Sequence, residues 1–199
     1  MIEAAVAAIR AGRPVILPTD TVYGLCADPY REGPARRAYR LKGRPAAEPS
    51  ALLAADLDLL LECVPELRGR SAAIARALLP GPFTLVLPNP ARRFRWLSGA
   101  TPEAIGVRVP LLPDLARAVV ERVGAVLATS ANLPGGPDPR RLADVPEELR
   151  AASGAALDGG ELPGVPSTVL SFVGARPEVL REGAASGAEA LERVAAALG

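Results

Sequence analysis

Histidine and glutamine are missing from this 199-residue sequence, and lysine occurs once, at Lys42. Without histidine, neither a Ser-His-Asp nor a Cys-His nucleophile system is available, and a His-ligated zinc site is excluded as well. The two cysteines, Cys26 and Cys63, form no CxxC pair and no disulfide framework, so we interpret both as buried thiols in a reducing compartment. These absences favour chemistry that depends on hydroxyls, amides and cations.

Aromatic residues number only seven, and the net charge is +1 at pH 7. A base-stacking platform and a general attraction for nucleic acid are therefore disfavoured, and RNA binding would need a local basic patch. No apolar run approaches the ~20 residues that span a bilayer. The N-terminal apolar stretch contains Glu3 and Arg10, unlike a secretory signal, so we expect a cytoplasmic protein that does not contact a membrane.

Arginine accounts for 22 of the 23 cationic residues, which makes Lys42 stand out. Lysine carries a compact, rotatable charge, whereas arginine carries a planar fork. Lys42 either remains by chance or is retained because its position requires a point charge.

Short apolar segments alternate with segments of helical periodicity along the whole sequence, which predicts a single α/β domain over residues 1–199. Ser71 is the expected N-cap of one helix. The predicted strands are 15–17, 51–54, 83–87, 105–109, 125–129, 167–173 and 179–181, and the predicted helices are 2–11, 33–42, 56–63, 71–79, 113–123, 144–151 and 186–198.

Scarce polar residues gather where predicted strands end. Thr19 and Asp20 follow the first strand, and Ser130 and Asn132 alternate onto one face after the strand at 125–129. Ligands of α/β sheets bind at such ends, although local turn hydrogen bonds would also account for these residue types.

Cations occur at comparable positions. Lys42 and Arg44 end a predicted helix, and in an extended backbone they would project to one side, although basic residues also complement the helix dipole there. Arg108 lies in an apolar strand and needs a partner, either an acidic residue of the protein or a substrate carboxylate. The sequence contains no GxxxxGK[ST] or GxGxxG motif, so phosphates would be bound by side-chain cations.

Seven segments between residues 14 and 183 contain most of these polar residues. They are PTDTVYGL at 18–25, KGRP at 42–45, LPGPFTLVL at 79–87, GVRVP at 106–110, TSAN at 129–132, PSTV at 166–169 and LREG at 180–183. In order and spacing these segments resemble the YrdC/TsaC family of threonylcarbamoyl-AMP synthases in its short, single-domain form. Three departures from the family pattern, at Cys26, Pro134 and Pro49-Ser50, do not involve Lys42, Arg44, Ser130 or Asn132.

The resemblance implies a YrdC/RibB-like fold, an open twisted mixed sheet flanked by helices, with a basic concave cavity. It also implies site residues, numbered here as in this sequence. The catalytic set is Lys42, Arg44, Ser130 and Asn132; the ATP-binding set is Lys42, Arg44, Ala46, Asn132, Arg140 and Arg181; and the threonine-binding set is Thr19, Arg108, Ser130 and Ser167.

The activity implied by the resemblance converts L-threonine, bicarbonate and ATP into threonylcarbamoyl-AMP and diphosphate, which supplies threonylcarbamoyladenosine formation beside the anticodon of tRNAs. Mg²⁺ would arrive with ATP, with no metal-ligand set and no tightly bound cofactor in the protein. The product would pass to downstream tRNA threonylcarbamoyl-transfer proteins, and direct contact with tRNA stays open.

Three other interpretations are weighed against this one. An RNA-binding module without catalysis would show salt-dependent RNA affinity and no ATP turnover. A relative that acts on carbamoyl phosphate, as in hydrogenase maturation, would carry additional cysteines and domains. A decayed paralogue would have lost part of the catalytic set, which is intact here.

Overall fold

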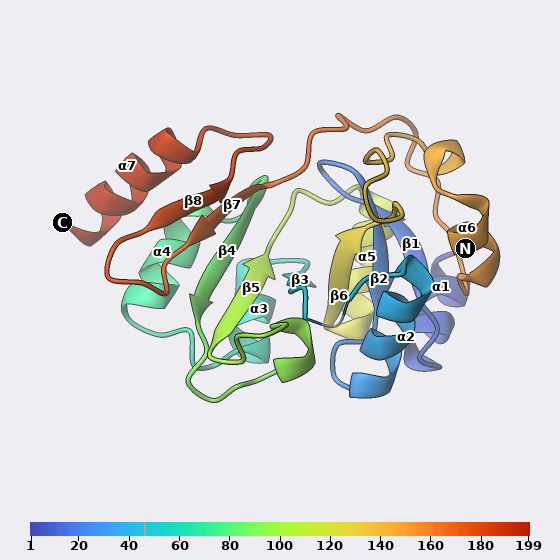
Figure 1. The fold of residues 1–199 in the computed structure, drawn as a ribbon, viewed down its shortest axis with the longest axis horizontal. Coiled ribbons are helices and arrows are strands. Elements are labelled where there is room, and N and C mark those ends of the chain that lie inside the picture. Colours follow the sequence, from blue (N-terminus) through green and yellow to red (C-terminus); the bar gives the residue numbers. More distant parts are fainter. Residues whose placement is uncertain (46) are drawn as a thin grey trace.

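The computed structural model describes residues 1–45 and 47–199, which form a single sheet with helices packed around it (Figure 1). In this part of the chain, no helix is both long and apolar enough to cross a membrane. The helices are α1 (Ile2–Arg10), α2 (Glu32–Lys42), α3 (Leu57–Cys63), α4 (Arg70–Leu78), α5 (Asp114–Val123), α6 (Glu147–Ala152) and α7 (Gly187–Leu198), with short 3-10 turns η1 (Arg95–Leu97) and η2 (Leu142–Asp144).

The sheet has the strand order β1-β2-β6-β3-β5-β4-β7-β8. The pairs β3/β5 and β4/β7 are parallel and the other pairs are antiparallel, so the predicted open mixed α/β sheet is confirmed. The chain termini lie at opposite ends of the molecule (Figure 1). The strands are β1 (Val15–Pro18), β2 (Tyr23–Ala27), β3 (Ala51–Ala54), β4 (Phe83–Pro88), β5 (Ala104–Arg108), β6 (Ala125–Ser130), β7 (Thr168–Ser171) and β8 (Glu178–Arg181).

Two local predictions were wrong. Strand β2 was missed because Tyr23–Ala27 is buried on both faces and shows no polar alternation, and because it follows a polar segment that resembles a loop. Ser71 is not the N-cap of α4, since the helix already begins at Arg70 and Gly69 occupies the N-cap position. The other predicted elements are present, with ends shifted by a few residues.

The two faces of the sheet are covered unequally. On one face, α2, α3, α4 and α7 contribute buried apolar side chains to a core that includes residues from each of the strands β1 to β7. On the other face, α1 and α5 pack against side chains from β1, β2, β3 and β6, and in the described chain this second core contains none from β4, β5 or β7. Part of the second face is therefore left uncovered.

The segment that leads from α6 to β7 crosses the upper edge of the molecule in Figure 1. Tyr23, fully buried on β2, fixes its beginning. The Tyr23 hydroxyl accepts a hydrogen bond from Gly159 N at 2.9 Å and lies 2.8 Å from Gly160 O and 3.0 Å from Asp158 Oδ1. Further along, Gly164 N donates to the carbonyl of Thr21 at 2.9 Å.

Replacing Tyr23 by Phe is expected to lower the free energy of unfolding by about 1–2 kcal/mol, because the variant loses the hydrogen bonds that join the hydroxyl to Gly159 N and Gly160 O. Urea unfolding followed by circular dichroism measures this value. Tyr30→Phe is the control, since Tyr30 is 47% exposed and its hydroxyl faces Cys63. Equal stabilities of the two variants would contradict the anchoring role.

Candidate active site

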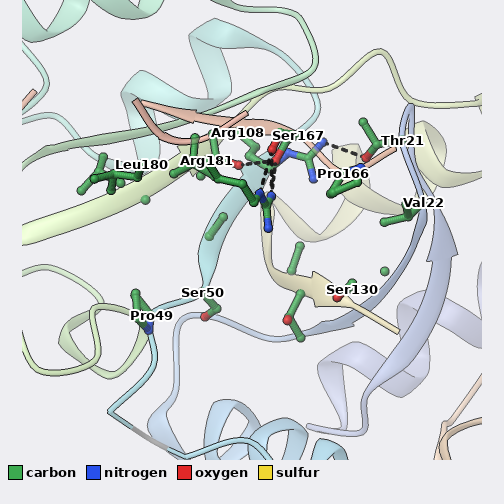
Figure 2. Close-up of a pocket in the computed structure, with 18 of the residues that line it drawn as sticks. Thr21, Val22, Pro49, Ser50, Arg108, Ser130, Pro166, Ser167, Leu180 and Arg181 are labelled. Atoms are coloured by element: carbon green, nitrogen blue, oxygen red, sulfur yellow. Dashed lines mark hydrogen bonds between the residues drawn. The ribbon is translucent and has the colours of Figure 1, made fainter. Parts of the chain in front are cut away.

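A cavity of about 390 Å³ lies on the uncovered part of the sheet (Figure 2). Its floor consists largely of small residues, which face the cavity from alternating positions of β2, β3, β5 and β6. Larger side chains at these positions would fill the space, so the small residues create the hollow. They are Gly24, Ala51, Ala104, Gly106 and Ala128.

Lys42 is the last residue of α2, and its side chain is buried behind the cavity wall. Its ammonium donates to Asn132 Oδ1 at 2.8 Å, to Ser130 Oγ at 3.1 Å and to the Ser130 carbonyl. Ser130 Oγ also donates to Asn132 Oδ1 at 2.7 Å. Burial, reinforced by the charge of Arg44, lowers the pKa of Lys42 to about 8. Three residues of the predicted catalytic set therefore form one hydrogen-bonded cluster.

Arg44, the fourth member, lines the cavity and donates from Nη1 to Thr129 Oγ1 at 3.0 Å. The backbone between the two cations is not extended as expected, because Gly43 adopts the left-handed conformation with φ of 66° and ends the helix. Lys42 and Arg44 nevertheless both reach the end of β6, through neighbouring residues of that strand.

Arg108 ends β5 and faces the cavity. Its partner is an acidic residue of the protein: Arg108 Nη2 lies 2.9 Å from Asp20 Oδ1 and 3.3 Å from Thr21 Oγ1. Arg108 Nε is buried and has no hydrogen-bond partner among the described residues. Burial raises the pKa of Asp20, outweighing the attraction of Arg108. The guanidinium thus keeps unused hydrogen-bonding capacity beside the cavity.

Arg181 is the last residue of β8 and lines the cavity next to Ser167 (Figure 2). Its guanidinium donates to the Ser167 carbonyl at 2.8 Å, and Ser167 Oγ is 2.8 Å from Thr84 Oγ1. The glycine of the LREG segment is required by this packing, because a Cβ atom on Gly183 would lie 2.2 Å from the Pro166 carbonyl oxygen.

Thr19 is buried at the end of the cavity next to β2. Its hydroxyl donates to the Val22 carbonyl at 2.7 Å and lies 3.1 Å from Thr21 Oγ1. Of the predicted residues, Thr19, Arg44, Arg108, Ser130, Ser167 and Arg181 line the cavity, and Lys42 and Asn132 lie directly behind Ser130.

Two predicted nucleotide contacts stand apart. Ala46 lies outside the described residues. Arg140 is exposed and lies outside the cavity lining, where it pairs with Glu161 at 2.8 Å and donates to the Leu162 carbonyl at 3.3 Å. In this conformation Arg140 contacts the segment between α6 and β7.

Several lining residues were not predicted from the sequence. Asp138 is the only carboxylate among the described lining residues, and Ser50, Ser98 and Thr101 add hydroxyls from loops. Nothing in their local sequence marks these loop residues. The small residues of the floor did leave a signal in β5, where Ala104 and Gly106 alternate with larger apolar residues.

Comparison with known proteins gives consistent matches. The family model Sua5_yciO_yrdC, described as telomere recombination, matches residues 7–183. A threonylcarbamoyl-AMP synthase of Pyrococcus abyssi is 34% identical over 88% of this chain and 52% of the relative. One of Stenotrophomonas maltophilia is 36% identical over 79% of this chain and 86% of the relative.

Among solved structures, P. abyssi Sua5 complexed with L-threonine superposes with a TM-score of 0.86 at 34% identity, over 97% of this chain and 56% of the other. The chain spans about half the length of the P. abyssi relative and of a Bacillus subtilis threonylcarbamoyl-AMP synthase that is 33% identical.

Proposed function

The chain belongs to the Sua5/YciO/YrdC family, and from this premise we propose that it is a threonylcarbamoyl-AMP synthase. The reaction would convert L-threonine, bicarbonate and ATP into threonylcarbamoyl-AMP and diphosphate. The observation that carries the proposal is the convergence of Lys42, Arg44, Arg108 and Arg181, from four distant parts of the sequence, at one cavity or directly behind its wall.

The amino acid is assigned to the end of the cavity near Arg108. Among the described residues, the guanidinium there has hydrogen-bond partners for Nη2 only, and a carboxylate is a group that arginine binds through strong, charge-assisted hydrogen bonds. The hydroxyls of Thr19, Ser130 and Ser167 would contact the remaining polar groups of L-threonine. The P. abyssi protein of the same family has been solved with L-threonine, which supports this substrate.

The triphosphate is assigned to the cations on either side of the cavity. Arg44 and Arg181 line it, and Lys42 adds its charge from behind Ser130. Asn132 orients Lys42 by accepting its hydrogen bond, and its own Nδ2 donates to Gly136 O at 2.7 Å, which holds the following loop. In this proposal Asn132 acts on ATP chiefly through Lys42, and Arg140 and Ala46 are further nucleotide contacts that a bound complex would test.

The proposed chemistry needs no protein nucleophile, in keeping with a chain that lacks histidine. The amine of L-threonine combines with bicarbonate to give a carbamate, with loss of water. A carbamate oxygen then forms a bond to the α-phosphorus of ATP while the bond from that phosphorus to the bridging oxygen breaks. The electron pair of the broken bond leaves on diphosphate. The protein contributes by aligning the two substrates and stabilising negative charge.

Mg²⁺ is proposed to enter with ATP. The described residues contain no cluster of three His, Cys, Asp or Glu side chains that would hold a metal on their own. Asp138 in the cavity lining offers a carboxylate oxygen, which fits an ion ligated mainly by phosphates and water. When bound, the ion would neutralise charge on the transferring phosphate.

The product would serve threonylcarbamoyladenosine formation on tRNA and would pass to the proteins that transfer the threonylcarbamoyl group.

The proposal is tested by mass spectrometry of products formed by the purified protein from ATP, bicarbonate and each amino acid in turn. Threonylcarbamoyl-AMP formed with L-threonine in preference to the other amino acids is the expected result. A protein that binds RNA in a salt-dependent manner and forms no adenylate would overturn it.

The affinity for ATP is expected to fall about tenfold between pH 7 and pH 9.5. The pKa of Lys42 is lowered to about 8, so its ammonium is charged below this pH and neutral above it. Loss of that charge removes one strong interaction with the phosphates. Calorimetric titration with a non-hydrolysable ATP analogue measures the effect. In Lys42→Arg the guanidinium stays charged over this range, so a pH dependence that persists unchanged in that variant would refute the assignment.

A further inference from the structure

Asp20 is not among the residues that the sequence motifs assign to binding, yet it contacts Arg108 more closely than any other side chain does. Both side chains are about nine-tenths buried, with exposed fractions of 10% for Asp20 and 11% for Arg108. Asp20 Oδ1 accepts from Arg108 Nη2 at 2.9 Å, and Oδ2 accepts from Leu111 N at 3.3 Å. The carboxylate is thus fixed from two sides and itself fixes one nitrogen of the guanidinium.

The contact also determines which part of Arg108 stays available. Nη2 is occupied by Asp20 and Thr21, and Nε is enclosed without a partner among the described residues. Nη1 also forms no hydrogen bond with the described residues, but it is not one of the enclosed atoms. Because Arg108 lines the cavity, Nη1 is the nitrogen that can donate to an incoming acceptor.

The charges around Arg108 indicate the sign of that acceptor. Arg181 is close enough to repel Arg108, and Asp20 compensates for one of the two positive charges. The two arginines and one aspartate leave this end of the cavity with a net positive charge, which favours an anionic acceptor.

We infer that Asp20 is a positioning residue, which holds the Arg108 guanidinium so that a substrate carboxylate is bound in one orientation. The inference rests on the proposed function, because it takes the carboxylate to be that of the amino acid. With the carboxylate fixed, the amine of the same molecule is fixed as well, and carbamate formation and attack on ATP both depend on where that amine lies.

A purely structural role is the alternative that a test must exclude. Asp20 follows β1, whereas Arg108 and Leu111 belong to β5 and the segment after it, and β2, β6 and β3 lie between these strands in the sheet. The contact therefore also connects two walls of the cavity. Loss of that connection would lower stability and the fraction of folded protein, but it would not separate turnover from binding.

The experiment compares Asp20→Asn with Asp28→Asn. Asp28 is a matched control, because it is 8% exposed, pairs with Arg31 at 2.7 Å and accepts from Tyr30 N, all outside the cavity lining. For Asp20→Asn, kcat of diphosphate release at saturating L-threonine should fall about 100-fold, while the Kd of L-threonine changes less than about tenfold. A less fixed Arg108 guanidinium weakens binding of L-threonine, whereas loss of the negative charge of Asp20 strengthens binding of a carboxylate. The two effects on the Kd therefore oppose each other.

Asp20→Glu provides a second measurement that keeps the charge and moves it by one methylene. A fall in kcat of about tenfold or more, with L-threonine still bound, is expected if position matters, and this variant also covers the case in which Asp20→Asn does not fold. Wild-type kcat in Asp20→Glu, or equal effects of Asp20→Asn and Asp28→Asn, would overturn the inference. A wild-type protein that releases no diphosphate in response to L-threonine would instead refute the proposed function.

Discussion

Diphosphate release from ATP, bicarbonate and L-threonine is expected to fall by about 10²–10³-fold in the Lys42→Ala variant. The ammonium is buried, is held by Ser130 and Asn132, and is the only lysine charge in the chain. Its removal takes away a charge that stabilises developing negative charge on the phosphates. It also releases the Asn132 amide from one of its bonds, so the loop after β6 loses part of its support.

Two further variants separate the charge from the packing. Lys42→Met keeps most of the side-chain volume and removes the charge together with its hydrogen bonds. Its loss of activity should match that of Lys42→Ala, while its unfolding free energy stays closer to that of the wild type. Arg40→Ala removes an exposed cation from the same helix and should retain normal activity. Diphosphate release at the wild-type rate in Lys42→Met would show that Lys42 has no role in the reaction.

The Lys42 cluster illustrates what the sequence could predict. Its members were marked by rarity and by motif: Lys42 is the single lysine, Asn132 is one of two asparagines, and Ser130 has the alternate spacing that places it beside Asn132. These side chains meet although the backbone after Lys42 is not extended as predicted, since Gly43 is left-handed. The motif spacing predicted which residues converge, whereas the path between them depended on a turn that the sequence reasoning did not identify.

Other features were beyond such reasoning for physical reasons. The partner of Arg108 could not be chosen from the sequence, because Asp20 is 88 residues away and becomes its neighbour only through the order of the strands. Arg140 is a cation in the loop that follows the TSAN motif, but the direction of its side chain depends on its ion pair with Glu161. Glu161 lies in a segment without regular structure, so this pairing could not be predicted. The cavity exists because α1 and α5 cover only part of one face of the sheet, and how far they extend over it is a property of tertiary packing.

Arg108→Gln is expected to weaken L-threonine binding by about 100-fold, or about 3 kcal/mol, with little change in the affinity for an ATP analogue. A substrate carboxylate bound by a largely buried guanidinium forms charge-assisted hydrogen bonds that glutamine replaces poorly. The cations assigned to the triphosphate are bound to segments other than β5, Lys42 and Arg44 to β6 and Arg181 to Ser167, so they should keep their positions. Calorimetric titration with each ligand measures both affinities.

The variant also leaves Asp20 buried without its cation, and that defect alone would destabilise the protein. The double variant Arg108→Gln/Asp20→Asn removes both charges of the pair and should regain part of the lost unfolding free energy. Because the two neutral amides still offer no cation to a carboxylate, the double variant should bind L-threonine as weakly as Arg108→Gln does. If L-threonine affinity returned together with stability, Arg108 would be a structural partner of Asp20 and the amino acid would have to bind elsewhere in the cavity.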